Sequence, residues 1–166
     1  MIQKKVCLLG AFATGKTSLV ARFVRSVFSE KYLTTVGVMI ERKTLTLDRT
    51  DLNLIIWDLH GEDEFQKVRA SYLRGTAGII FVVDGTRRET LARAEQLYEE
   101  ARLAIGPVPC IVALSKCDLA DQWEIDEASL AGLRALGCPW VRTSAKTGEG
   151  VEDTFVTLAR EMIGHD

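Results

Sequence analysis

The sequence predicts an α/β fold, in which a mostly parallel sheet of six strands, one of them antiparallel, carries helices on both faces. Short apolar runs alternate with segments of helical periodicity along nearly all of the 166 residues, as in right-handed strand–helix–strand units. The run 79–83 is almost wholly apolar, which is typical of a strand buried on both faces. We expect one domain over residues 1–166.

The first half of the chain predicts a strand, a helix and an antiparallel hairpin. Residues 6–9 form a short apolar strand. Residues 36–40 alternate as a half-buried strand, the polar segment 48–51 turns the chain, and 52–57 returns as the partner strand. The charged segment 62–74 has apolar residues at helical spacing. The helix after the first strand has an apolar stripe made of Leu19, Val20, Phe23, Val24 and Val27.

Two helices of the second half have boundary signals. Thr86 and Glu89 form a capping box that opens a helix, which ends before Gly106. Asp126 can cap the next helix, and Gly137 terminates it. Further strands are predicted at 110–114 and 140–143, and a last helix has the apolar stripe Val151, Phe155, Leu158 and Met162. Ligands of such sheets lie at the carboxyl ends of the strands.

Composition and charge exclude several classes of partner. With a formal net charge of −2, no strong field draws the protein to nucleic acid or anionic lipid. The four cysteines form no CxxC pair and predict reduced thiols in a cytoplasmic protein. No apolar run approaches the roughly 20 residues that cross a bilayer. Because Lys16 cuts short the apolar run near the start of the chain, we also expect no cleaved signal peptide.

Residues 10–17, GAFATGKT, match the pattern GxxxxGK(S/T) between a predicted strand and a predicted helix. In that setting, backbone N–H groups and the helix N-terminus converge on a phosphate chain. Lys16 would reach the outer phosphates, and the Thr17 hydroxyl would offer a hard oxygen to Mg²⁺. A plain glycine turn is the alternative, which the flanking elements disfavour. The residues expected around the phosphates are Gly10, Ala13, Thr14, Gly15, Lys16, Thr17 and Ser18.

Three further motifs follow predicted strands. Asp58 and Gly61 form DxxG, which could hold a magnesium-bound water and meet a terminal phosphate oxygen. Asp118 of SKCD, beside Lys116, can accept two N–H bonds, which matches the N1 and N2 edge of guanine and not adenine. In TSAK, the N–H of Ala145 could meet guanine O6. Each motif alone could be a polar turn or loop, but their joint order favours a guanine-nucleotide site.

With these motifs the chain resembles Ras-superfamily small GTPases over essentially its whole length, and most closely their Rab branch. GAFATGKT resembles the family's phosphate loop, KYLTTVGV its first switch and WDLHGE its second. SKCD and TSAK resemble its NKxD and SAK motifs. The resemblance implies a P-loop NTPase fold, binding of GTP or GDP with Mg²⁺, and hydrolysis of GTP to GDP and phosphate.

The resemblance also assigns roles that the motifs alone do not. Thr35 would ligate Mg²⁺ in the GTP state and Phe28 would pack beside guanine, although they could be an ordinary loop threonine and core residue. A monomer would meet effectors, exchange factors and activating proteins through residues 32–40 and 58–74.

The implied catalytic residues are Lys16, Gly61 and Glu62. The implied metal ligands are Thr17, Thr35 and Asp58. Further nucleotide contacts are Gly61, Ser115, Lys116, Asp118, Ser144, Ala145 and Lys146. An apolar effector-facing triad would be Ile40, Trp57 and Tyr72.

The chain departs from the family pattern at several positions. Glu62 replaces the usual water-orienting glutamine, and an ionised carboxylate only accepts hydrogen bonds. His60 replaces an alanine, and Phe12 is bulky where the family has a small residue that an arginine finger can approach. Ser115 replaces the asparagine of NKxD, so we expect weakened but retained nucleotide binding. No cysteine follows Cys138, so a lipidated tail is either absent from this chain or not used.

Two functions fit these residues. The leading interpretation is a magnesium-dependent guanine-nucleotide switch with slow intrinsic hydrolysis. The alternative is a GTP-binding scaffold in which Glu62 abolishes useful turnover. A small-molecule kinase would need an acceptor pocket and a basic lid, and the sequence offers two guanine-edge motifs instead.

Overall fold

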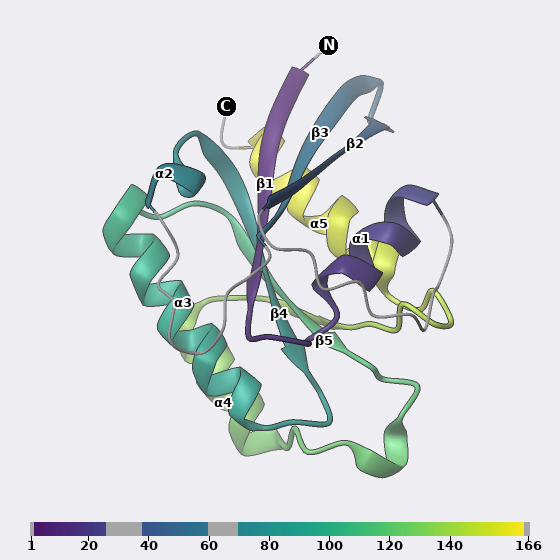
Figure 1. Ribbon diagram of the computed structural model, residues 1–166. Coiled ribbons are helices and arrows are strands. Elements are labelled where there is room, and N and C mark those ends of the chain that lie inside the picture. The colour runs from purple at the N-terminus through teal and green to yellow at the C-terminus, as the bar shows by residue number, and fades with distance from the viewer. Residues whose placement is uncertain (1, 26–37, 60–69, 165–166) are drawn as a thin grey trace.

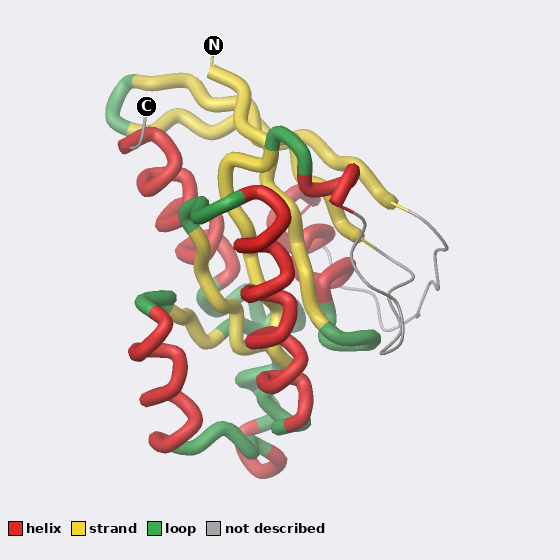
Figure 2. Tube along the Cα trace, turned by 90° about the vertical axis from the view of Figure 1, so that its left-hand side faces the viewer, coloured by secondary structure: helices red, strands yellow, loops and turns green. Residues whose placement is uncertain are grey.

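A computed structural model of the protein describes residues 2–25, 38–59 and 70–164. It contains a six-stranded sheet in the order β2-β3-β1-β4-β5-β6. All strand pairs are parallel except β2–β3, which form an antiparallel hairpin at one edge of the sheet (Figure 2). The strands are β1 Ile2–Gly10, β2 Val38–Leu47, β3 Thr50–Leu59, β4 Thr76–Asp84, β5 Cys110–Ser115 and β6 Trp140–Arg142. The predicted fold class is therefore confirmed.

The helices cover both faces of the sheet (Figure 1). They are α1 Lys16–Arg25, α2 Ala70–Leu73, α3 Glu89–Ile105, α4 Glu127–Leu136 and α5 Val151–Gly164, with a short 3-10 turn at Ala120–Gln122. Among the described residues, no helix is long and apolar enough to span a membrane. Val27, Val36 and most of the segment 62–74 lie outside the described residues.

Alternating side chains of the central strands build two apolar layers, because successive residues of a strand point to opposite faces. Val6 and Leu8 of β1 pack with the residues of α1 and α5, whereas Cys7 and Leu9 pack with those of α3 and α4. Phe23 of α1 stacks on Phe155 of α5 with ring centroids 3.9 Å apart. The buried sheet therefore offers a rigid base for the loops at its ends.

Five of the six strands run in the same direction, so their carboxyl ends lie at one edge of the sheet. The phosphate-loop pattern follows β1, DxxG begins at the end of β3, SKCD spans the end of β5, and TSAK follows β6. The topology thus brings together motifs that are up to about 130 residues apart in the chain, as predicted for this architecture.

The predicted capping box at the start of α3 is wrong. The hydroxyl of Thr86 donates to the buried Asp84 Oδ1 at 2.7 Å, and among the described residues the N-cap side chain of the helix makes no capping hydrogen bond. The helix N-cap is Arg88, whose backbone N–H is bound by Glu124 Oε1 at 2.8 Å. The other predicted cap is confirmed, since Asp126 accepts from the backbone N–H of Ser129.

Candidate functional site

The loop of residues 10–17 connects β1 directly to α1 and lies against the ends of β4 and β5. A Cβ at Gly10 would lie 2.5 Å from the carbonyl oxygen of Val82, so this close approach requires glycine. Gly15 has φ of 100°, and Ala13 has φ of 63°. Such alternation of backbone conformation forms a concave nest of N–H groups. The loop is therefore shaped to hold an anion.

Donors from inside the loop and α1 occupy its first carbonyl oxygens. Lys16 Nζ donates to the oxygens of Gly10 at 3.0 Å and Ala11 at 3.2 Å. The hydroxyl of Thr14, which is fully buried, donates to the Ala11 oxygen at 3.0 Å. The Lys16 side chain therefore crosses the loop, where its ammonium group lies within the concave turn.

Donors from other parts of the sheet edge occupy the carbonyl oxygens of residues 12–14. Because the C=O and N–H of a trans peptide point in opposite directions, an outward carbonyl turns the next N–H toward the inside of the loop. The contacts are Arg87 Nη2 to Phe12 at 2.8 Å, Lys116 Nζ to Ala13 at 3.4 Å, and Ser115 Oγ to Thr14 at 2.6 Å. The loop is thus held from outside, with the N–H groups of residues 13–15 directed toward its inside.

Ser115, which replaces the asparagine of NKxD, is hydrogen-bonded to the phosphate loop. Its hydroxyl lies 2.6 Å from the Thr14 oxygen and 3.0 Å from the Val83 oxygen, and the side chain is buried. A short hydroxyl suffices because the loop approaches closely: a Cβ at Gly15 would lie 3.9 Å from Ser115 Oγ. The substitution therefore leaves the junction between the loop and β5 connected.

Thr17 and Asp58 are brought together at the end of β3. The Thr17 hydroxyl donates to Asp58 Oδ2 at 2.9 Å, and Asp58 is fully buried. Two hard oxygen donors beside an anion-binding loop fit the preference of Mg²⁺ for oxygen ligands and phosphates. These two residues could hold a magnesium ion, directly or through water. Ser18 lies next to them in the first turn of α1 and is half-buried.

A second buried carboxylate, Asp84, lies at the end of β4 and was not predicted as part of the site. Its Oδ2 accepts from Lys116 Nζ at 2.6 Å and from Arg87 Nε at 3.0 Å. Burial alone would raise the pKa of Asp84, but the hydrogen bonds from Lys116, Thr86 and Arg87 outweigh it and hold the pKa below its usual value. The sequence signal that could have pointed to Asp84 is its position directly after the apolar run 79–83.

The SKCD and TSAK loops are hydrogen-bonded to each other. Asp118 Oδ1 accepts from the hydroxyl of Ser144 at 2.7 Å, and the backbone N–H of Cys117 donates to the Thr143 oxygen at 3.0 Å. Ser144 is fully buried, so its hydroxyl holds one oxygen of the Asp118 carboxylate from the protein interior. Ala145 is half-buried and Lys146 is exposed. The structure therefore unites both motifs in one polar surface beside the phosphate loop.

Several predicted site residues lie outside the described residues. They are Phe28, Thr35, His60, Gly61 and Glu62. The flanks of both switch segments are described: Ile40 is 49% exposed, and Trp57 and Tyr72 are half-buried. Lys5 Nζ lies 3.8 Å from the centroid of the Trp57 ring and donates to the Tyr72 carbonyl oxygen at 2.6 Å. Two of the three predicted triad residues are thus linked through one lysine.

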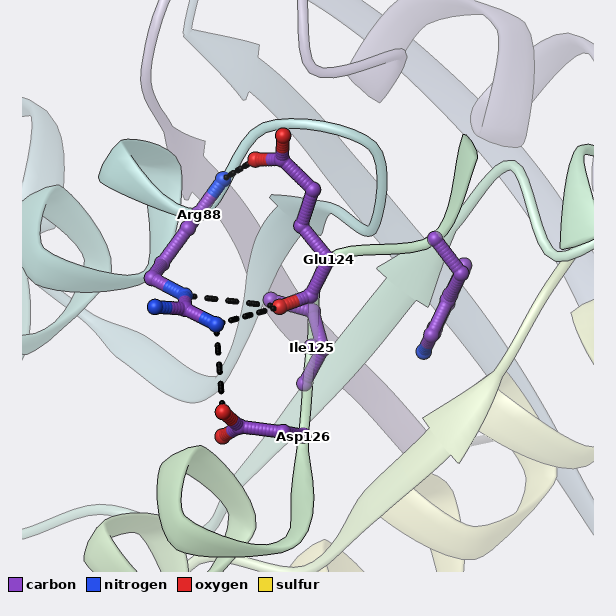
Figure 3. A pocket seen from close by; sticks show the side chains of 5 residues that line it. Arg88, Glu124, Ile125 and Asp126 are labelled. Carbon is purple, nitrogen blue, oxygen red and sulfur yellow. Dashed lines mark hydrogen bonds and ion pairs between the residues drawn. The ribbon is translucent and has the colours of Figure 1, made fainter. Parts of the chain in front are cut away.

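A separate surface hollow of about 440 Å³ lies where α3 begins and the 123–126 segment passes it (Figure 3). The Arg88 side chain in its lining donates to the Glu124 carbonyl oxygen at 3.2 Å and to Asp126 Oδ2 at 3.1 Å. These contacts bind the walls to one another and tie α3 to the start of α4. We therefore assign this hollow a structural role, distinct from the site at the phosphate loop.

Comparison with known proteins agrees with this geometry. The model of the Ras family matches residues 5–164. The chain is also 36% identical over 160 residues to Ras-related protein RIC1 of rice, Oryza sativa subsp. japonica, an alignment that covers 95% of this chain and 79% of that protein. Both comparisons support a small GTP-binding protein, while the Rab branch stays a prediction from the motifs. This chain belongs to the Ras family.

Proposed function

We propose that the protein is a magnesium-dependent guanine-nucleotide switch that binds GTP and GDP and hydrolyses GTP to GDP and phosphate. The observation that carries this proposal is the convergence of two features at one sheet edge. The carbonyl oxygens of residues 12–14 in the phosphate loop are held outward, and the paired SKCD and TSAK loops lie beside it. The first feature suits a polyphosphate, and the second suits a purine base with hydrogen-bond donors on its edge.

The phosphates would lie in the nest of residues 10–17. Its inward N–H groups and the N-terminus of α1 favour negative charge, and Lys16 supplies a cation to the outer phosphates. Thr17 and Asp58, whose oxygens lie 2.9 Å apart, would hold Mg²⁺ together with Thr35. When bound, the ion neutralises charge that develops on the phosphate oxygens.

Guanine recognition would depend on Asp118. One carboxylate can accept both N1–H and N2–H of guanine, whereas adenine offers an unprotonated N1 there. Ser144 donates to the Asp118 carboxylate at 2.7 Å and so limits its rotation. The backbone N–H of Ala145 would meet guanine O6, with Phe28, Lys116 and Lys146 around the base. Because Ser115 keeps only a hydroxyl where relatives have an amide, we infer weaker but retained binding.

The switch itself would use the segments that carry Thr35 and Gly61. Contacts from these residues to the γ-phosphate would hold residues 32–40 and 58–74 in one conformation, and hydrolysis would release them. Effectors, exchange factors and activating proteins would read these segments. We infer a monomer that works in the cytoplasm.

Intrinsic hydrolysis should be slow because of Glu62. The proposed catalytic groups are Lys16, the N–H of Gly61 and the side chain at 62. An amide there can donate to a phosphate oxygen while it accepts from water, but a carboxylate only accepts and is repelled by the phosphates. Single-turnover GTP hydrolysis should therefore be faster in Glu62→Gln than in the natural protein. An unchanged or lower rate would refute this role of Glu62.

The same residue favours the alternative, a scaffold that binds GTP and hardly turns it over. The nucleotide that copurifies with the protein separates the two functions. After extraction and chromatography, GDP is expected for the switch, because the bound GTP has been hydrolysed during isolation. Persistent GTP would favour the scaffold, and the absence of any guanine nucleotide from a protein that also fails to bind added GDP would refute both.

A further inference from the structure

The middle of the phosphate loop contains a residue in an unfavourable conformation. Ala13 has φ of 63°, in the left-handed region where an L-residue with a Cβ is disfavoured. Such a conformation persists only where the surroundings hold it. The two peptide groups on either side of Ala13 are therefore the places to look for the groups that hold it.

Both of these peptide groups are bound from outside the loop by cations. Arg87 Nη2 donates to the carbonyl oxygen of Phe12 at 2.8 Å, and Lys116 Nζ lies 3.4 Å from that of Ala13. The Phe12 contact is the shorter of the two. Because the peptide is planar, an oxygen held toward Arg87 directs the N–H of Ala13 to the opposite side, into the nest.

Asp84 joins the two cations. Its Oδ2 accepts from Arg87 Nε at 3.0 Å and from Lys116 Nζ at 2.6 Å, and its side chain is only 1% exposed. The guanidinium group is planar, so its Nε can bind the carboxylate while its Nη2 reaches the loop. We call Arg87, Asp84 and Lys116 the cation clamp. It connects the end of β4, the SKCD loop and the phosphate loop.

We propose that Arg87 is a positioning residue for the bound nucleotide: by holding the Phe12 carbonyl outward, it keeps the Ala13 N–H directed at the phosphates and slows nucleotide release. This inference rests on the proposed function. Arg87 does not touch the nucleotide; it acts through the Phe12–Ala13 peptide. The predicted effect is mainly on retention of the nucleotide, because Arg87 is partly exposed and Lys116 still pairs with Asp84 when Arg87 is removed.

The neighbouring arginine provides a matched control. Arg88 also donates to a backbone carbonyl and a carboxylate, those of Glu124 and Asp126 (Figure 3), but at the surface hollow and not at the phosphate loop. Removal of either side chain deletes the same chemical group. Arg87→Lys adds a conservative variant, since one ammonium group cannot reproduce the fork that binds both acceptors.

The test measures release of a fluorescent GDP analogue from Arg87→Ala, Arg88→Ala, Arg87→Lys and the natural protein. Loss of one charge-assisted hydrogen bond predicts about tenfold faster release from Arg87→Ala. Arg88→Ala should stay within about twofold of the natural protein, and Arg87→Lys should lie between. The amide resonance of Ala13 should shift in Arg87→Ala and not in Arg88→Ala. Because Arg87 also pairs with Asp84, the thermal midpoint of Arg87→Ala should fall by about 2–4 °C, whereas Arg88→Ala and Arg87→Lys should melt within about 2 °C of the natural protein.

The outcomes are separable. Release from Arg87→Ala at the natural rate, with the analogue bound normally, would overturn the inference and leave the proposed function intact. Equal acceleration in Arg88→Ala would also overturn it, because the effect would then be general loosening of the α3 end. Failure of the natural protein to bind the analogue at all would refute the proposed function and, with it, this role of Arg87.

Discussion

Replacement of Asp84 with asparagine tests how strongly the buried carboxylate holds the site together. An amide can keep the two bonds from Thr86 to its oxygen, but its NH₂ group then faces Lys116 and Arg87 in place of Oδ2, which accepts at 2.6 and 3.0 Å. The full contribution of two charge-assisted bonds, about 1.5–3 kcal/mol each, is an upper bound on the loss in the free energy of unfolding. Because both cations are 36% exposed and regain water, we expect a loss of about 2–3 kcal/mol in the free energy of unfolding.

The assay is urea unfolding followed by circular dichroism, with Asp126→Asn as the control. Asp126 also accepts from a hydroxyl and a backbone N–H, those of Ser129, and pairs with Arg88, but its side chain is 53% exposed. Asparagine caps helices as well as aspartate does, so this variant should unfold at nearly the natural urea midpoint. A loss below about 1 kcal/mol in Asp84→Asn, or equal effects in the two variants, would refute the reasoning.

The pH dependence of the same variant follows from the lowered pKa of Asp84. A carboxyl group whose pKa is lower in the folded than in the unfolded state stabilises the protein above its unfolded pKa, and this contribution is lost as the pH falls through the folded value. The stability difference between the natural protein and Asp84→Asn should therefore be constant near neutral pH and shrink below about pH 4. A difference that stays constant down to pH 2 would contradict this assignment.

Two further predictions concern the loops around the site. Gly10→Ala forces a Cβ to within 2.5 Å of the Val82 oxygen; it should lower the free energy of unfolding by about 1–3 kcal/mol, and an unchanged urea midpoint would be inconsistent with this contact. Burial and the hydrogen bond to Glu149 raise the pKa of Cys117 to about 12, so at pH 8 this thiol should react slowly with a disulfide reagent. Glu149→Gln should lower that pKa and speed the labelling, as followed by peptide mass spectrometry; equal rates would argue against the assignment.

Much of the fold could be predicted because the relevant signals are local. The apolar run 79–83 lies within β4, and Asp126 caps α4 as its position before the helix indicates. The meeting of Thr17 with Asp58, and of Asp118 with Ser144, followed from topology, because parallel strands place their carboxyl ends at one edge.

The parts that could not be predicted depend on contacts between distant segments. Arg87 and Phe12 are 75 residues apart, and no periodicity in either segment indicates that they touch. The capping box failed partly for the same reason, because Glu124 from another loop binds the helix start. The other cause is local: Asp84, two residues before Thr86, accepts the hydroxyl that the pattern assigns to the helix.

The central claim is that the phosphate loop and the paired SKCD and TSAK loops form one site for a guanine nucleotide. The most direct measurement is isothermal titration calorimetry of the nucleotide-free protein with GDP and with ADP, in the presence of Mg²⁺. Both ligands offer the same diphosphate to residues 10–17, so only the base distinguishes them. A site built to bind the base edge through Asp118 should prefer GDP by at least about 100-fold. Equal affinities, or no binding of GDP, would contradict the account.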